Sequence, residues 1–242
     1  MVNVELLSFA SADELARAAA SAWLDEIEIA NRAGQRHCVA LSGGRIAQSF
    51  FRAVVEQNGQ RKISFSNVHF FWADERCVPP TDPESNFRTA NEALFAPLKI
   101  APNQIHRVRG EDVPAAAAKL AETELVRFAR NNPDGFPALD SIFLGMGEDG
   151  HVASLFPENI EKNLDVSVPF LVVNNSPKPP PVRISISYKM IFAAKNLWIL
   201  VSGTGKESAL RESLSPTGRT PLACVIQARP TKIFSDLTFF NL

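Results

Sequence analysis

Four short polar clusters hold most of the residues in this chain that could act on a small anion. They are Ser42-Gly43-Gly44, Asp74-Glu75-Arg76, residues 145–151 and residues 202–206. Glycine lets a backbone approach a ligand closely, and the free N–H groups at a helix start favour negative charge. Lysine and arginine donate charge-assisted hydrogen bonds to phosphate or carboxylate oxygens. The clusters therefore predict a binding site for a small anionic molecule.

His151 is the residue best suited to acid–base chemistry. It ends a glycine loop and follows two acids, Glu148 and Asp149, either of which would fix the tautomer of its ring. An unperturbed imidazole pKa of about 6.5 suits a general base near neutral pH. The chain has no G-x-S-x-G motif, so water is the expected nucleophile if the reaction is hydrolytic. The other histidines lie in or beside strand patterns and are expected to be structural: His37, His69 and His106.

Two glycine motifs resemble nucleotide-binding patterns without completing them. Residues 145–150 match G-x-G-x-x-G, but Pro157 follows too soon for the crossover helix that a dinucleotide site needs. We expect these glycines to shape a sharp loop that presents His151. Residues 203–206 resemble half of a phosphate loop and lack its upstream glycine. Lys206 is therefore expected to hold a single phosphate rather than a nucleoside triphosphate.

Each cluster directly follows a predicted strand. Short apolar runs predict these four strands: residues 37–41, 68–73, 141–144 and 196–201. Further strands are predicted at residues 168–173, 183–187 and 231–234. Five helices are predicted. The first follows a capping box at residues 11–14, and the second follows Ser42-Gly43-Gly44 and runs through Phe50 and Val54. The others span residues 86–95, span residues 114–130, and begin at Gly205. Residues 176–181, Ser-Pro-Lys-Pro-Pro-Pro, are expected to be a stiff loop between strands, with a polyproline ligand for a partner as the alternative.

Alternating strands and helices predict a mostly parallel sheet with helices on both faces. Ligands of such sheets bind outside the carboxyl ends of the strands. If the strands are parallel, the four clusters meet at one edge of the sheet. The sequence therefore predicts one composite site rather than four separate ones.

Composition narrows the class of protein. The 242 residues suffice for one large domain or two small ones, and no apolar run approaches the roughly 20 residues that span a bilayer. With 25 Lys and Arg against 26 Asp and Glu, the net charge of −1 argues against a general nucleic-acid binder. Three widely spaced cysteines and no secretory pattern favour reduced thiols in a cytoplasm. No His-x-His or His-Glu-x-x-His spacing supports a metal site.

Taken together, these stretches resemble the 6-phosphogluconolactonase family. They occur in the family's order, and the segment that contains His151 is the most specific of them. The matching stretches are residues 41–44, 72–76, 85–86, 144–157, 183–185 and 203–206. The resemblance implies a Rossmann-like α/β fold shared with glucosamine-6-phosphate deaminases and ribose-5-phosphate isomerases. It also implies that residues 1–242 form a single sugar-phosphate hydrolase domain.

The reaction implied by the resemblance is hydrolysis of 6-phosphoglucono-δ-lactone to 6-phosphogluconate in the pentose phosphate pathway. A sugar phosphate is then the expected small-molecule partner, and no metal or organic cofactor is expected. Neither a nucleic acid nor a membrane is expected as a partner, and protein partners stay open. The expected location is the cytoplasm.

The related deaminases differ from this chain just after the histidine. Their pattern continues Ile-Ala-Phe-Asn-Glu-Pro, whereas residues 152–157 are Val-Ala-Ser-Leu-Phe-Pro. Phe156 stands where the deaminases have an acid that helps to orient their histidine, which favours a lactonase. Two alternatives are a sugar-phosphate isomerase or deaminase that uses Asp74 as its base, and a non-catalytic sugar-phosphate-binding protein.

The matching positions give each site residue an expected role. His151 removes a proton from water, Asp149 or Glu148 orients its ring, and Asp74 binds hydroxyls or orients Arg76. The phosphate is expected to bind Lys206, Arg76 and the backbone of Ser42, Gly43 and Gly44. Arg183 and Asn86 are expected to contact sugar or carboxylate oxygens.

Arg45 departs from the family pattern, in which Ser-Gly-Gly is usually followed by Ser/Thr-Pro. The chain instead continues Arg45-Ile46-Ala47. A guanidinium offers a bidentate contact to phosphate in place of the lost hydroxyl. The alternative is an arginine that turns to solvent.

Overall fold

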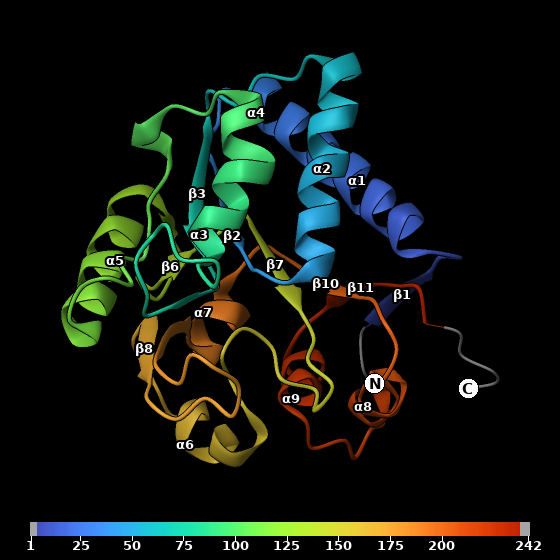
Figure 1. Cartoon of the computed structure of the whole chain (residues 1–242), viewed down its shortest axis with the longest axis vertical. Coiled ribbons are helices and arrows are strands. Elements are labelled where there is room, and N and C mark those ends of the chain that lie inside the picture. The colour runs from blue at the N-terminus through green and yellow to red at the C-terminus, as the bar shows by residue number, and fades with distance from the viewer. Residues whose placement is uncertain (1–3, 238–242) are drawn as a thin grey trace.

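Six parallel strands form the central sheet of the computed structural model, which describes residues 4–237. Their order is β1-β11-β10-β7-β2-β3, and each neighbouring pair runs in the same direction (Figure 1). In this order the strands are β1 (Val4–Ser8), β11 (Thr231–Ser235), β10 (Asn196–Val201), β7 (Ser141–Gly145), β2 (His37–Leu41) and β3 (Val68–Trp72). The mostly parallel sheet predicted from the sequence is confirmed.

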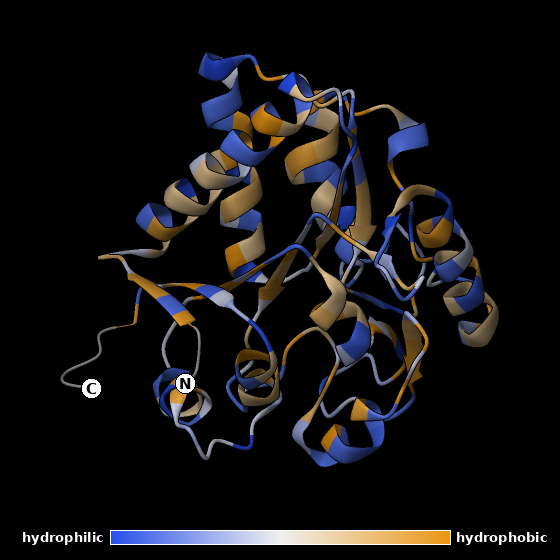
Figure 2. Ribbon diagram, turned by 180° about the vertical axis from the view of Figure 1, so that it is seen from behind, coloured by the Kyte–Doolittle hydropathy of each residue, from blue (hydrophilic) through white to orange (hydrophobic). Residues whose placement is uncertain are grey.

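Helices cover both faces of this sheet, as predicted. In Figure 1, α1 (Ala12–Arg32) and α2 (Arg45–Arg61) lie above the sheet, whereas α7 (Tyr188–Ala193), α8 (Glu207–Leu214) and α9 (Pro221–Ala228) lie below it. Because no face is left to solvent, the central strands are continuous apolar runs; every residue of β2 is buried. Hydrophobic colour accordingly follows the strands, while the helices show mixed colours (Figure 2).

Trp23 ties α1 to α2 and to the sheet. Its ring centroid lies 5.6 Å from that of Phe50 on α2 and 5.4 Å from that of Phe143 on β7. The indole Nε1 donates to Nε2 of His37 over 3.2 Å. Burial lowers the pKa of His37 to about 4, so the ring is neutral and can accept this bond. His37 thus supports the core, in line with the structural role expected for it.

The strands predicted near residues 168–173 and 183–187 lie outside the parallel sheet. They are β8 (Phe170–Val173) and β9 (Arg183–Ile186), and they pair antiparallel with each other. Residues 174–182 join them without a helix, which is too short for a parallel crossover. β9 also pairs with β4 (Asp74–Arg76), so the second polar cluster is a short strand rather than a loop. Three charged residues give no strand signal in the sequence.

Two predicted helices are present, but their boundaries or their regularity differ from the prediction. The predicted helix over residues 86–95 consists of α3 (Asn86–Ala90), a π-helical turn (Asn91–Phe95) and α4 (Ala96–Leu98). Helix α5 (Pro114–Phe128) ends at Phe128 instead of residue 130. Strand β1 was not predicted from the sequence. The remaining short elements are the 3-10 helices Pro102–Gln104 and Pro157–Asn159, α6 (Ile160–Leu164), β5 (Arg130–Asn131) and β6 (Pro137–Ala138).

The parallel arrangement brings the four polar clusters together. Strands β2, β3, β7 and β10 end at the same edge of the sheet, and each leads directly into one cluster. The predicted convergence of the clusters is therefore confirmed. Separately, no helix within residues 4–237 is both long and apolar enough to cross a membrane.

Candidate active site

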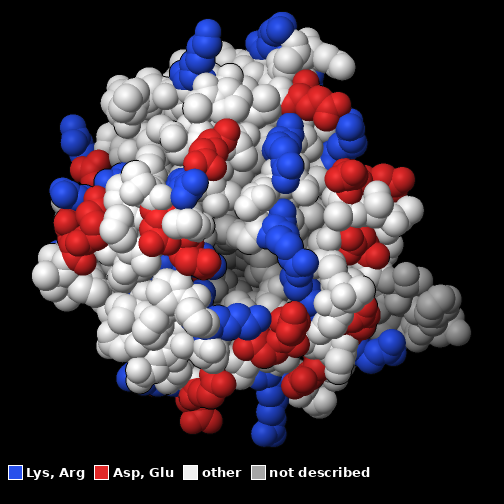
Figure 3. Space-filling model, in the orientation of Figure 1, with Lys and Arg blue, Asp and Glu red and all other residues white. Residues whose placement is uncertain are grey.

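A cavity of about 570 Å³ opens at the carboxyl ends of the strands. Figure 3 shows the hollow near the middle of the view, with lysine and arginine side chains on more than one side of it. All predicted site residues line the cavity except Asn86 and Asp149. Those that line it are Ser42, Gly43, Gly44, Arg45, Asp74, Arg76, His151, Arg183 and Lys206.

His151 is held in place by the acid two residues before it. Its Nδ1 lies 2.5 Å from Oδ1 of Asp149, and the same oxygen accepts from the His151 backbone N–H over 3.1 Å. Gly147 lies under the ring, where any side chain would collide with the imidazole. Nε2 has no hydrogen-bond partner in the described part of the chain, and the ring lines the cavity. This arrangement presents Nε2 to a ligand as a proton acceptor.

Asp149 therefore holds the His151 ring without lining the cavity itself. Burial acts to raise its pKa, but the charge and hydrogen bonds of His151 outweigh burial and bring the pKa below its ordinary value. The sequence left open whether Glu148 or Asp149 contacts the ring, and the structure places Asp149 there. The ring of Phe156 packs against the imidazole ring of His151, with the two ring centroids 4.7 Å apart.

Asp74 is fixed by two neighbours on different elements. Its Oδ2 accepts from Oγ of Ser154 over 2.7 Å, and the amide nitrogen of Asn86 donates to the Asp74 carbonyl over 2.8 Å. Asn86 is buried beneath Gly43, whose lack of a side chain makes room for it. The structure thus places Asn86 behind the cavity as a support for Asp74, not in the lining where a substrate contact was expected.

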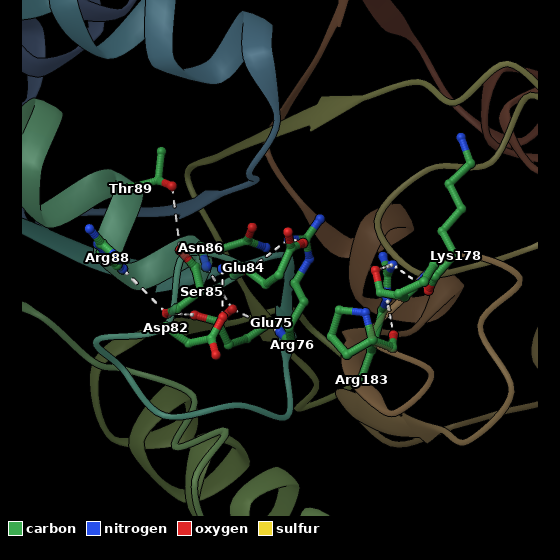
Figure 4. Close-up of polar contacts among 12 residues, drawn as sticks. Glu75, Arg76, Asp82, Glu84, Ser85, Asn86, Arg88, Thr89, Lys178 and Arg183 are labelled. Atoms are coloured by element: carbon green, nitrogen blue, oxygen red, sulfur yellow. Dashed lines mark hydrogen bonds and ion pairs between the residues drawn. The ribbon is translucent and has the colours of Figure 1, made fainter.

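Glu75 holds the start of α3 against β4 (Figure 4). Its two carboxylate oxygens accept from the backbone N–H groups of Arg76, Asn86 and Phe87, and from Oγ of Ser85. These bonds cap a helix start that would otherwise leave donors unpaired. Burial raises the pKa of Glu75 to about 7, with a smaller contribution in the same direction from Asp74, against the hydrogen bonds that favour the charged form.

Arg76 is held by Glu84 rather than by Asp74. Its Nη1 donates to the Glu84 carbonyl over 2.7 Å and lies 3.5 Å from the Glu84 carboxylate. Its buried Nε has no hydrogen-bond partner in the described residues. The orienting role that the sequence suggested for Asp74 is therefore filled by Glu84.

Two loops, residues 42–44 and 202–206, form one side of the cavity. The Ser42 hydroxyl donates to the Phe143 carbonyl over 2.8 Å, so the serine fixes its loop. Gly44 has a φ of 95° at the N-cap of α2, a conformation that suits glycine. Asp236 anchors the fourth cluster by accepting from the Ser202 hydroxyl over 2.7 Å. These contacts leave the backbone at the start of α2 facing the loop that carries Lys206.

Lys206 and Arg45 lie near this backbone, and their positive charges repel each other. Burial lowers the pKa of Lys206, and the neighbouring Arg45 lowers it further, while Glu148 opposes them. Arg45 begins α2, and its guanidinium extends to Gly203 in the neighbouring loop. Neither cation forms an ion pair with an acid of residues 4–237 at salt-bridge distance. An anionic ligand would supply the missing negative charge.

Three residues that shape the cavity were not predicted from the sequence. Lys178 and Glu84 line it, and Asp236 holds the loop before Lys206. The proline-rich segment before Arg183 was a signal for Lys178, but its composition does not show which way the loop points. No sequence signal marks Glu84 or Asp236. Within the described ranges, no group of three or more His, Cys, Asp and Glu side chains is placed to hold a metal ion.

The fold and the cavity define a Rossmann-like α/β protein with a histidine and several cations in one cavity at the carboxyl ends of the strands. The sequence matches the family model described as glucosamine-6-phosphate isomerases/6-phosphogluconolactonase over residues 10–234. The chain belongs to this family.

Known relatives are similar over most of the chain. It is 39% identical over 186 residues to a 6-phosphogluconolactonase of Treponema pallidum, covering 76% of this chain and 75% of that protein. It is 32% identical over 231 residues to a 6-phosphogluconolactonase of Mycobacterium leprae, covering 92% of each. A solved 6-phosphogluconolactonase from Shewanella baltica superimposes with a TM-score of 0.81, at 26% identity, over 97% of this chain and 98% of that one.

The raised pKa of Glu75 predicts how its contribution to stability changes with pH. Because the folded pKa of about 7 exceeds the ordinary 4.5, the folded protein keeps a proton that the unfolded chain has lost between these values. The stabilisation is full below pH 4.5 and is lost as the pH rises through 7. By urea denaturation, the stability of wild type relative to Glu75→Gln should fall between pH 5 and pH 8. The exposed Glu158→Gln is the control, and a constant difference across that range would contradict the prediction.

Proposed function

We propose that this chain is a 6-phosphogluconolactonase that hydrolyses 6-phosphoglucono-δ-lactone to 6-phosphogluconate in the pentose phosphate pathway. The observation that carries the proposal is His151, oriented by Asp149 and open to a cavity lined by cations. Family membership and the relatives described above support the same activity. Residues 1–242 would act as a single hydrolase domain.

His151 is the base in this mechanism. Its Nε2 takes a proton from a water molecule, and the resulting hydroxide attacks the lactone carbonyl. Asp149 stabilises the imidazolium that forms, because a carboxylate on Nδ1 favours the charged ring. The tetrahedral intermediate then expels the ring oxygen, which receives the proton from His151 and becomes a hydroxyl group. The proton is thus returned, and no cofactor is consumed.

The phosphate binds Lys206, Arg76 and the backbone of Ser42, Gly43 and Gly44. Helix α2 begins at this backbone, and its unpaired N–H groups favour a negative charge. Arg45 adds a guanidinium at the first position of the helix. Cations also stabilise the oxyanion that develops on the carbonyl, an effect worth about 3 kcal/mol per donor in known enzymes. Asp74 is placed in the lining to accept hydrogen bonds from sugar hydroxyls.

Phe156 favours the lactonase over a deaminase. It is buried and packs on the ring of His151, so the apolar side chain stands where a deaminase uses an acid. The open Nε2 of His151 favours an enzyme over a protein that only binds sugar phosphates. The two assays that separate these functions are hydrolysis of the phosphorylated lactone and ammonia release from glucosamine 6-phosphate. We propose a cytoplasmic location, which the three free cysteines support.

Replacement of His151 tests the base. We expect His151→Ala to lower kcat for the phosphorylated lactone by roughly 10²–10⁴-fold, the usual contribution of a positioned base. Asp149→Asn should lower it less, since it removes only the support of the ring. Rates must be corrected for spontaneous opening of the lactone, and circular dichroism checks the fold. Corrected activity near that of wild type in His151→Ala would show that another group is the base.

Lys206 tests the phosphate site. Lys206→Ala should weaken binding of 6-phosphogluconate by about tenfold or more, because a charge-assisted hydrogen bond is lost. Hydrolysis of unphosphorylated gluconolactone should be slow in wild type and nearly unchanged in the variant. The exposed Lys119→Ala is the matched control for loss of one positive charge. An equal loss for both substrates would place Lys206 outside the phosphate site.

Arg45 tests whether this chain has replaced a hydroxyl by a guanidinium as a phosphate ligand. Arg45→Ser restores the residue type usual in the family, and it should raise KM for the phosphorylated lactone by about tenfold. Arg52→Ser, at an exposed position of the same helix, is the control. Unchanged or improved affinity in Arg45→Ser would assign phosphate binding to Lys206, Arg76 and the backbone without Arg45.

A further inference from the structure

The proline-rich loop of residues 176–181 is wrapped around the side chain of Arg183. The Arg183 guanidinium donates to three successive carbonyls, from Nη2 to Lys178 over 2.9 Å and to Pro179 over 3.2 Å, and from Nε to Pro180 over 3.2 Å. Arg183 itself is 4% exposed, so these bonds are shielded from solvent. They fix the backbone of the loop at the entrance of the cavity.

Additional bonds close the loop on itself. The Ser176 backbone N–H donates to the Pro181 carbonyl over 2.9 Å, and the Ser176 hydroxyl donates to the Lys178 carbonyl over 2.9 Å. Prolines restrict the backbone further by fixing φ. The loop is therefore a preformed support, and a ligand would not need to order it.

The Lys178 side chain points away from the Arg183 guanidinium and lines the cavity (Figure 4). Its ammonium group forms no ion pair with an acid in the described part of the chain. It also acts electrostatically on Lys206, together with Arg45, so the three cations surround one region. A ligand with more than one negative charge would offset the repulsion among these three positive charges.

We propose that Lys178 is a phosphate-binding residue of this enzyme and that Arg183 is the residue that positions it. The loop places the Lys178 ammonium across the cavity from the start of α2, so that the phosphate is bound from both sides. The bonds of Arg183 to the loop use Nε and Nη2, which leaves Nη1 for the substrate contact that the sequence predicts for this residue. The inference rests on the proposed function for the identity of the ligand, but not for the presence of an anion site.

The test compares Lys178→Ala with Lys178→Arg and with the exposed control Lys162→Ala. Lys178→Ala should raise KM for the phosphorylated lactone by about tenfold with kcat within about twofold of wild type. Lys178→Arg should keep most of the affinity, and Lys162→Ala should match wild type. Hydrolysis of unphosphorylated gluconolactone should not respond to any of the three. An unchanged KM in Lys178→Ala, or an equal effect on both lactones, would overturn the proposal.

The positioning role of Arg183 is tested by a double-mutant cycle. Arg183→Lys keeps the charge but cannot donate to three carbonyls, so the loop should lose its fixed position. In that background, Lys178→Ala should change KM by less than about twofold, because the contribution of Lys178 is already lost. A full tenfold effect in the Arg183→Lys background would show that Arg183 does not position Lys178.

Binding of 6-phosphogluconate, measured by calorimetry, separates this inference from the proposed function. If wild type fails to hydrolyse the lactone, the proposed function is wrong. The Lys178 variants are still informative, since binding requires no turnover. About tenfold weaker binding in Lys178→Ala, with Lys162→Ala unchanged, would support an anion contact at Lys178, and equal binding in both variants would exclude it.

Discussion

Parallel pairing of the six central strands is the constraint on which the site depends. Since every strand runs in the same direction, the segments after β2, β3, β7 and β10 leave the sheet at one edge. Both faces of the sheet are covered by helices, so charged groups are excluded from most of the strands and gather in these segments. Residues far apart in the chain, such as Gly44, His151 and Lys206, therefore line one cavity.

Neighbouring side chains, in the lining or behind it, hold the residues that face the cavity. Asp149 orients His151, Asn86 and Ser154 hold Asp74, and Glu84 holds Arg76. The site is thus organised before a ligand enters, which reduces the cost of ordering side chains during the reaction. Burial and mutual repulsion of Arg45, Lys178 and Lys206 work against stability, because these cations form no salt bridge with an acid of residues 4–237. A phosphate bound among them would offset this cost, which is the physical reason for the anion site that we propose.

The sequence was a good guide to buried strands and a poor guide to contacts behind the site. The strands at residues 37–41, 141–144 and 196–201 each begin with a polar residue and continue as an apolar run, because burial on both faces of the sheet favours apolar side chains. β4 is three charged residues and carries no such pattern. The position of Asn86 depends on how α3 packs under Gly43, a contact between distant segments that spacing along the chain does not encode. Lys178 was missed for the same reason, because bonds from Arg183 and Ser176 to carbonyls of the loop fix its position.

The central claim is that one cavity holds a phosphate at the start of α2 and presents the lactone carbon to His151. The most direct measurement is a crystal structure of the protein with 6-phosphogluconate bound. We expect phosphate oxygens within about 3 Å of the Lys206 ammonium and of backbone N–H groups of residues 42–44, with the product carboxylate beside Nε2 of His151. A phosphate bound next to His151, or a product bound outside this cavity, would contradict it.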